Sequence, residues 1–244
     1  MKILVIGESC RDVFNYGSCI RLCPEAPVPV FNPVEVIDNG GMAKNVYRNV
    51  MSLGAKANLV TNSNWQSITK TRFIDKKTNH MFMRLDCNDG DYGRAELEKI
   101  KFDNYDAVIL SDYNKGFMTE DDIAYVAKNH PLTFLDTKKI LGEWCKDITF
   151  IKINDNEFEK TKHMVGPEIE SKMIMTMGSE GCRYAGVTYS VPSVEIKDPS
   201  GAGDTFVASL AYKYVESGHN MEKAIEFANK CATEVVQRRG VSTV

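Results

Sequence analysis

The sequence predicts an α/β protein, a three-layer αβα sandwich with a mostly parallel central sheet and a small β-sheet lid. Short apolar, β-branched runs alternate with helix-period segments along most of the chain, as in parallel sheets that are covered by helices on both faces. Two stretches, residues 11–37 and 69–87, break this alternation, because each is strand-like and contains no helix-period segment. These stretches predict the lid.

The first predicted strand covers residues 2–6, an apolar run that ends at Gly7. Similar runs predict further strands at residues 57–61, 107–110, 133–135, 150–153 and 173–176. The predicted helices cover residues 42–53, 121–129, 157–164, 203–217 and 221–238. Strand and helix thus follow one another in the order of a parallel sheet.

The lid is predicted from the two segments that lack this order. Residues 11–37 are strand-like and contain the proline-rich run 24–29, whereas residues 69–75 and 80–87 form a hairpin pattern around the polar turn 76–79. We therefore expect one domain over residues 1–244, with a β lid formed from about 11–37 and 69–87.

Composition argues for a small-molecule ligand. Hydrophobic residues make up 43% of the chain and charged residues 26%, and the net charge is −3 with Lys and Arg spread along the sequence. That balance is typical of a globular protein and does not favour nucleic-acid or membrane binding.

The cysteines and the N-terminus indicate a cytoplasmic protein. Seven cysteines, an odd number without a Cys-x-x-Cys pair, are typical of free thiols in a reducing compartment. The apolar run at residues 3–6 is too short for a signal sequence or a membrane span.

The most informative segment is Asp198-Pro-Ser-Gly-Ala-Gly-Asp204, a loop of small residues that leads directly into a predicted helix. Free N–H groups at a helix N-terminus form an anion site, and glycines let a phosphate approach the backbone. Asp204 would stand beside that anion, a position that suits a carboxylate that deprotonates a hydroxyl. Alternatively, the glycines form a tight turn and Asp204 is only a helix N-terminal charge.

The seven-residue string resembles the ribokinase/PfkB family signature Asp-Thr-x-Gly-Ala-Gly-Asp. The resemblance implies a ribokinase-like fold, ATP and Mg²⁺ as cofactors, Asp204 as general base, and the N–H groups of Gly201, Ala202 and Gly203 as stabilisers of the transferring phosphoryl group. It also implies a monovalent cation, K⁺, near Asp198. Pro199 stands where the family carries Thr and removes one N–H donor. Whether a cation binds near Asp198 is therefore left open.

The acceptor residues follow from the same resemblance. Gly40, Gly41 and Asn45, at the start of a predicted helix, match the glycines and asparagine that hold the sugar in ribokinase-like enzymes. Asp12, after the first strand, matches the acid that binds sugar hydroxyls. Taken alone, Gly40 and Gly41 are also compatible with a turn, Asn45 with a surface residue and Asp12 with a solvated loop acid.

The nucleotide residues are expected on later strands. Asn154 and Glu157 match the family's Asn-x-x-Glu, which is thought to organise Mg²⁺ and phosphate through water, although Asn154 is also a good helix N-cap. Three further positions, Thr176, Gly178 and Gly181, match the Thr-x-Gly-x-x-Gly that lies along the nucleotide, where a plain hairpin turn is the alternative. Asn229 lies where relatives enclose adenine.

Several strings are similar to one branch of the family, the kinase domain of the bifunctional D-glycero-D-manno-heptose 7-phosphate kinase and heptose 1-phosphate adenylyltransferase. They lie at residues 21–30, 69–73, 84–86, 110–116 and 136–138. The resemblance implies phosphorylation of heptose 7-phosphate at its anomeric position, and cations for the phosphate of the acceptor: Arg84, Lys115 and Lys138. It also implies a homodimer, because lids of relatives clasp each other.

Two departures from this branch are visible. A short polar connection at residues 62–67 replaces about one strand–helix unit, and the sequence ends at Val244 without a nucleotidyltransferase domain. The alternatives are a kinase for another sugar or a nucleoside, and a catalytically silent binding module on the same fold. A dinucleotide oxidoreductase is disfavoured, because the first strand is not followed by Gly-x-Gly-x-x-Gly.

Overall fold

An eight-stranded sheet forms the centre of the computed structural model, which describes all residues 1–244. Its strand order is β12-β11-β10-β9-β8-β7-β1-β4. The six parallel strands are β1 (Lys2–Gly7), β4 (Lys56–Val60), β7 (Ala107–Asp112), β8 (Thr133–Thr137), β9 (Phe150–Asn154) and β10 (Met173–Thr176). These are the six strands predicted from the apolar runs, which confirms the parallel sheet.

The antiparallel strands β11 (Cys182–Tyr184) and β12 (Val187–Tyr189) complete one edge of the sheet. The sequence analysis did not predict them as strands, because each has only three residues, too few for a period to be visible.

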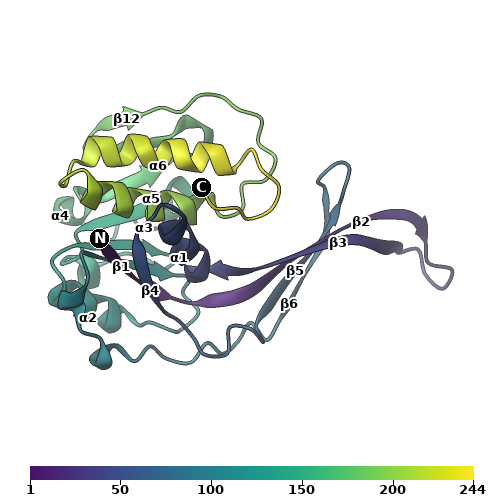
Figure 1. The fold of residues 1–244 in the computed structure, drawn as a ribbon, viewed down its shortest axis with the longest axis horizontal. Coiled ribbons are helices and arrows are strands. Elements are labelled where there is room, and N and C mark those ends of the chain that lie inside the picture. The colour runs from purple at the N-terminus through teal and green to yellow at the C-terminus, as the bar shows by residue number, and fades with distance from the viewer.

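Helices cover both faces of the sheet (Figure 1). On one face lie α1 (Ala43–Ser52), α5 (Ala202–Glu216) and α6 (Met221–Val235). On the other lie α2 (Glu120–Asn129), α3 (Asp155–Thr161) and the short α4 (Pro167–Glu170). Short 3₁₀ turns occur at Leu97–Lys99, Phe102–Asn104, Glu143–Cys145 and Gly178–Glu180. The three layers predicted from the sequence are confirmed.

Strand β1 shows why apolar runs form the centre of this sheet. Ile3 and Val5 are fully buried in the cluster beneath α1 and α5, and Leu4 and Ile6 are fully buried in the cluster beneath α2. Successive side chains of a strand point to opposite faces, so a strand between two helical layers must be apolar at every position.

The lid is a second, four-stranded sheet with the order β3-β2-β5-β6. It consists of β2 (Ser9–Leu22), β3 (Pro29–Met42), β5 (Thr69–Asp75) and β6 (Met81–Cys87). The lid extends slightly beyond the predicted ranges, since β2 begins at Ser9 and β3 ends at Met42. Figure 1 shows the lid projecting from the α/β body as a long arm.

Residues 61–68 join β4 to β5 without a helix or strand, so β4 is the edge strand of the central sheet. The lid root also contacts the C-terminal segment, where Val241 packs against Phe14, Tyr16 and Ile74 of the lid. None of the helices combines the length and the apolar character that crossing a membrane requires.

Candidate active site

The loop before α5 separates two cavities. One cavity, of about 400 Å³, runs along α5 and α6 and is called here the long cavity; Ala202 and Gly203 line it. The other, of about 310 Å³, lies under the lid and is called the lid cavity; Gly201 and Asp204 line it. A group bound at this loop can therefore be reached from both cavities.

The N-terminus of α5 offers free donors at this boundary. The Ala202 N–H donates to the Pro199 carbonyl at 3.2 Å, whereas the N–H groups of Gly201 and Gly203 have no acceptor within the chain. Gly201 has a φ of 81°, a left-handed conformation that glycine adopts without strain. Free N–H groups and the positive end of the helix dipole form an anion site.

Asp198 shapes this loop. One of its carboxylate oxygens accepts the Ser200 N–H at 2.9 Å, and the other accepts the Gly240 N–H at 3.1 Å. The carboxylate therefore ties the loop to the C-terminal segment.

Asp204 points into the lid cavity and is 6% exposed. Its Oδ2 accepts a hydrogen bond from Asn45 Nδ2 at 3.0 Å, and its Oδ1 accepts one from the Tyr113 hydroxyl at 2.7 Å. Burial raises the pKa of Asp204 to about 6, although both hydrogen bonds oppose this rise. The group is thus ionised at neutral pH and has a pKa suited to accepting a proton.

Four cationic side chains line the lid cavity together with Asp204: Lys70, Arg72, Arg84 and Lys115. Arg72 forms an ion pair with Asp12, and Arg84 pairs with Asp86 at 2.5 Å. The remaining two ammonium groups share one carboxylate, Asp89, at 3.0 and 2.8 Å. Four cations but only two acids, Asp12 and Asp204, line the cavity itself, so its lining carries an excess of positive charge.

The pKa values of two of these acids are shifted in opposite directions. Burial raises the pKa of Asp12, against the effect of its Arg72 partner. Burial would also raise the pKa of Asp89, but hydrogen bonds from Lys115, Tyr92 and Lys70 outweigh it and hold the pKa below its usual range.

Most of the predicted acceptor residues lie in the lid cavity. Its lining includes Asp12, Gly41, Asn45, Arg84 and Lys115.

Two predicted acceptor residues lie elsewhere. Gly40 faces away from the lid cavity, and a Cβ at this position would lie 2.1 Å from the Lys44 side chain. Lys138 pairs with Glu157 and lies near the ring of Tyr113, outside the lining of the lid cavity. Adjacent strand residues point to opposite faces, which is why Gly40 and Gly41 separate.

Glu8 positions the loop that carries Lys115. Its fully buried carboxylate accepts the N–H groups of Tyr113 and Lys115, each at 2.9 Å, and burial raises its pKa. The same loop thereby presents Tyr113 to Asp204 and Lys115 to the lid cavity.

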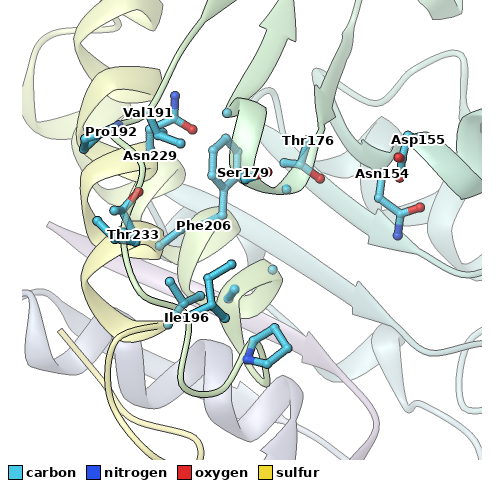
Figure 2. A pocket seen from close by; sticks show the side chains of 18 of the residues that line it. Asn154, Asp155, Thr176, Ser179, Val191, Pro192, Ile196, Phe206, Asn229 and Thr233 are labelled. Atoms are coloured by element: carbon cyan, nitrogen blue, oxygen red, sulfur yellow. The ribbon is translucent and has the colours of Figure 1, made fainter.

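The two ends of the long cavity differ: one combines apolar side chains with Asn229 and Thr233, and the other is polar (Figure 2). Val191, Ile196 and Phe206 lie near α6, and Asn154 lies at the opposite end, on the tip of β9. An apolar slot suits a flat base. Ala202 and Gly203, at the α5 N-terminus, line the same cavity. The predicted nucleotide residues that line this cavity are Asn154, Thr176, Gly178, Gly181 and Asn229.

Glu157 does not line the long cavity. It forms a capping box with Asn154, in which the Asn154 side chain accepts the Glu157 N–H and the Glu157 carboxylate accepts the Asn154 N–H. Its other oxygen pairs with Lys138. Asn154 is therefore both a helix cap and a lining residue.

Oxygen donors of the kind that Mg²⁺ prefers are present, but they are few. Asn154 and Glu157 supply an amide and a carboxylate, and no group of three or more His, Cys, Asp or Glu side chains is arranged to hold a metal. Mg²⁺ in nucleotide sites usually keeps several waters and uses one or two protein ligands. These residues fit an ion bound through water.

The sequence analysis missed Lys70, Arg72, Tyr113, Asp136 and Lys152. Lysine at the centre of the apolar strand β9 was a visible signal for Lys152, because unpaired charges are rare in buried strands. The sequence carried no comparable signal for the contact of Tyr113 with Asp204.

A family model matches most of the chain. The model described as pfkB family carbohydrate kinase matches residues 92–244.

The curated relatives are similar over nearly the whole chain. The bifunctional protein HldE of Helicobacter pylori strain J99 is 31% identical over 297 positions, and that of a Nitratiruptor species is 28% identical. The matches cover 98% and 99% of this chain and 63% of each relative, so the chain spans less than two thirds of their length. The 297 aligned positions exceed the 244 residues of this chain, so the relative contains residues without a counterpart here.

Solved structures share the fold. A nucleoside kinase of Methanocaldococcus jannaschii matches with a TM-score of 0.71 at 17% identity, covering 98% of this chain and 93% of that one. Arabidopsis thaliana ribokinase, complexed with ribose and ATP, matches with the same TM-score, identity and coverage.

Proposed function

This chain belongs to the pfkB family of carbohydrate kinases, and on that basis we propose that it transfers the γ-phosphoryl group of ATP to a phosphorylated sugar. The favoured acceptor is heptose 7-phosphate, which would be phosphorylated at its anomeric hydroxyl. The family consists of ATP-using phosphotransferases with alcohol acceptors. Two points belong to the proposal, namely the phosphate on the acceptor and the heptose.

One observation carries the proposal of a phosphorylated acceptor. The lid cavity contains a base, Asp204, and an excess of cationic side chains that includes Lys70, Arg84 and Lys115. A phosphate group that leaves water must be paired with cations. An unphosphorylated sugar would make no use of these cations, which would then have only the acids of the lid as partners.

Heptose is proposed as the sugar because of the sequence resemblance to a heptose 7-phosphate kinase domain described above, together with the similarity to the HldE proteins. At about 30% identity they are proteins to which the chain is similar over nearly all of its length. Because the chain spans only part of each relative, their second activity is not part of the proposal.

The residues divide the reaction between them. Asp204 takes the proton of the acceptor hydroxyl, whose oxygen attacks the γ-phosphorus of ATP, and the bond from that phosphorus to the β–γ bridging oxygen breaks to release ADP. The N–H groups of Gly201 and Gly203 donate to the transferring phosphoryl oxygens, supported by the α5 dipole. Asn45 and Tyr113 hold the carboxylate in place.

Mg²⁺ supplies charge neutralisation for the phosphates of ATP when it is bound. We propose that Asn154 and Glu157 hold it through water, because the Glu157 carboxylate is already occupied by Lys138 and by the capping box.

A monovalent cation near Asp198 fits less well. Both carboxylate oxygens of Asp198 accept backbone N–H groups, and Pro199 has no N–H to shape a cation loop. We propose that Asp198 acts as a structural tie of the loop and does not ligate K⁺ directly.

We also propose a homodimer formed through the lid. The lid carries ten of the seventeen exposed large hydrophobic side chains of the chain: Ile20, Leu22, Val28, Val34, Val36, Ile37, Met81, Phe82, Met83 and Leu85. Exposed apolar sheet surfaces of this kind are usually covered by a partner. Sedimentation of the purified chain tests this, and a monomer at micromolar concentration would contradict it.

ADP release measured across a panel of acceptors tests the function. The panel pairs D-glycero-D-manno-heptose 7-phosphate with the free heptose, and adds ribose 5-phosphate, fructose 6-phosphate, ribose and nucleosides. We expect the highest kcat/KM with heptose 7-phosphate and a loss of at least about 100-fold when its phosphate is absent.

Other outcomes of the panel are informative. Preference for a different sugar phosphate would contradict heptose as the sugar but support a phosphorylated acceptor. Preference for a free sugar or a nucleoside would refute the proposal that the acceptor carries a phosphate. Nucleotide binding without turnover of any acceptor in the panel would favour a catalytically silent binding module.

A further inference from the structure

A buried lysine lies at the polar end of the long cavity. Lys152 is the central residue of β9, between the buried Ile151 and Ile153, and is 5% exposed. Its Nζ donates to Asp136 Oδ2 at 3.0 Å. Removing an ammonium group from water carries a large desolvation penalty, so its presence in this strand requires a reason.

The ammonium of Lys152 lies against the first turn of α5. A Cβ added to Gly203 would be 2.9 Å from Lys152 Nζ, closer than ordinary contacts allow. Glycine at 203 therefore leaves room for the ammonium beside the free Gly203 N–H. An anion bound by that N–H would meet the lysine charge at the same time.

The ion pair of Lys152 is also incomplete. Nζ has one hydrogen bond in the chain, to Asp136, although an ammonium has three donors. Asp136 Oδ1 is buried and has no hydrogen-bond partner, and the nearest other cation to it, Lys138 Nζ, is 4.0 Å away. Donors therefore remain available on a buried cation that lines a cavity.

A second buried pair at the same edge of the sheet shows the difference. Lys139 Nζ bonds both carboxylate oxygens of Asp112, at 2.8 and 2.9 Å. Asp112 also accepts the Asn114 N–H and the Thr137 hydroxyl, so both its oxygens are used. Lys139 lines neither the long nor the lid cavity. We call this pair closed, because both carboxylate oxygens are used and the lysine lines neither cavity, and we take its role as structural. The Lys152–Asp136 pair is open, because donors of Lys152 and one oxygen of Asp136 have no partner.

We propose that Lys152 is a catalytic residue that donates hydrogen bonds to the γ-phosphoryl group of ATP while Asp136 holds its ammonium in place. The proposal rests on the kinase function given above. The γ-phosphoryl is the target because Gly203 lies one residue from Asp204, at the boundary between the two cavities, where the transferred group must stand. In this role Lys152 supplies hydrogen bonds and charge, and the proton of the acceptor goes to Asp204.

Nucleotide binding without any acceptor tests the proposal. The variant Lys152→Met removes the charge and keeps the length of the side chain, and titration calorimetry compares a non-hydrolysable ATP analogue with ADP in the presence of Mg²⁺. We expect the ATP analogue to bind at least about 10-fold more weakly and ADP to change less than about 3-fold, because ADP lacks the group that Lys152 contacts. In the presence of a working acceptor, kcat should fall by about 100-fold or more.

Lys139→Met is the matched control, since it removes an ammonium from the closed pair, and it should bind both nucleotides as the parent protein does. Lys152→Arg keeps the charge and should retain the preference for the ATP analogue. Equal weakening of both nucleotides in Lys152→Met, or no weakening of either, would overturn the proposal.

If Lys152→Met does not fold, Lys152→Gln takes its place, because it also lacks the charge but keeps a polar group beside Asp136. The expected difference between the ATP analogue and ADP is the same, and so are the results that overturn the proposal. Because no acceptor is present, these results stand apart from the acceptor assignment. Failure of the heptose assignment would leave the difference between the two nucleotides intact.

Discussion

The Tyr113 hydroxyl donates a 2.7 Å hydrogen bond to Asp204 Oδ1 across 91 residues of sequence. This bond joins the loop after β7 to the first turn of α5. It stabilises the ionised carboxylate and so opposes the rise in the Asp204 pKa that burial causes.

Tyr113→Phe should move the acid limb of the pH profile upward. The variant removes a hydrogen bond that lowers the Asp204 pKa, so the pKa should rise above its value of about 6. The profile of kcat/KM between about pH 5 and 9 measures this shift. Tyr125→Phe, on the exposed side of α2, is the control and should leave the limb in place. An unshifted limb in Tyr113→Phe would show that the bond does not affect the base.

Asp204→Asn should abolish most of the turnover and spare nucleotide binding. An amide cannot accept the proton of the acceptor hydroxyl, so kcat should fall by about 10²- to 10⁴-fold. Asp204 lines the lid cavity and not the long cavity, so the affinity for ADP should stay within about 3-fold of the parent value. Steady-state kinetics measure kcat, and calorimetry measures the affinity for ADP. An unchanged kcat would show that Asp204 is not the general base.

Asp204→Asn should also stabilise the fold at high pH more than at low pH. The folded-state pKa of Asp204, about 6, lies above the ordinary value of 3.8, so the folded protein binds the proton more tightly and loses stability as pH rises from about 4 to 6. Above about pH 7 the carboxylate then costs at most about 3 kcal/mol, which the neutral amide avoids. Urea unfolding at about pH 5 and pH 8 measures the difference, and an equal effect at both would contradict the shift.

Gly201→Ala should impair the loop more than a comparable change elsewhere. Gly201 has a positive φ, and a Cβ there would lie 2.8 Å from Asn45 Nδ2, which bonds Asp204. Gly218→Ala is a matched control, because its φ is also positive but nothing lies within 4 Å of the added Cβ. Both variants should lose about 1 kcal/mol in urea unfolding from backbone strain, and only Gly201→Ala should lose turnover. Equal activities would show that the space at Gly201 is not needed.

Arg84→Met should raise KM for a phosphorylated acceptor by at least about 10-fold, because a cation that pairs with phosphate is lost from the lid cavity. The KM for ATP should change little, since Arg84 does not line the long cavity. Lys76→Met, at an exposed ion pair with Glu35 elsewhere on the lid, is the control. A rise in the KM for ATP instead would indicate that the cations of the lid do not serve the acceptor.

The elements of the fold were largely predictable because their signals are local. The six apolar runs became the parallel strands, and the loop at residues 198–204 became the N-terminus of α5, as the glycines and the following apolar period indicated. Strands β11 and β12 escaped prediction, since three residues do not show a period.

The candidate site was predictable only in part. Asp12, Asn45 and Asp204 follow from a motif resemblance and lie together in the lid cavity. Gly40 was expected beside Gly41, but the alternation of the strand turns it to the other face. Lys70 was missed because, in sequence, it is one of many polar residues of the lid; burial and its partner Asp89 distinguish it only in the fold.

The amino-acid sequence alone thus determined the layers of this protein and the position of the loop 198–204 at the start of a helix, because hydrophobic period and small residues act on neighbours along the chain. Only the tertiary structure decided what surrounds the reacting groups. Tyr113 reaches Asp204 from the loop after β7, and Lys152 reaches the turn at Gly203 from the centre of β9. Such contacts depend on how parallel strands and a helix are placed side by side. No local sequence pattern encodes the distance between residues that are so far apart along the chain.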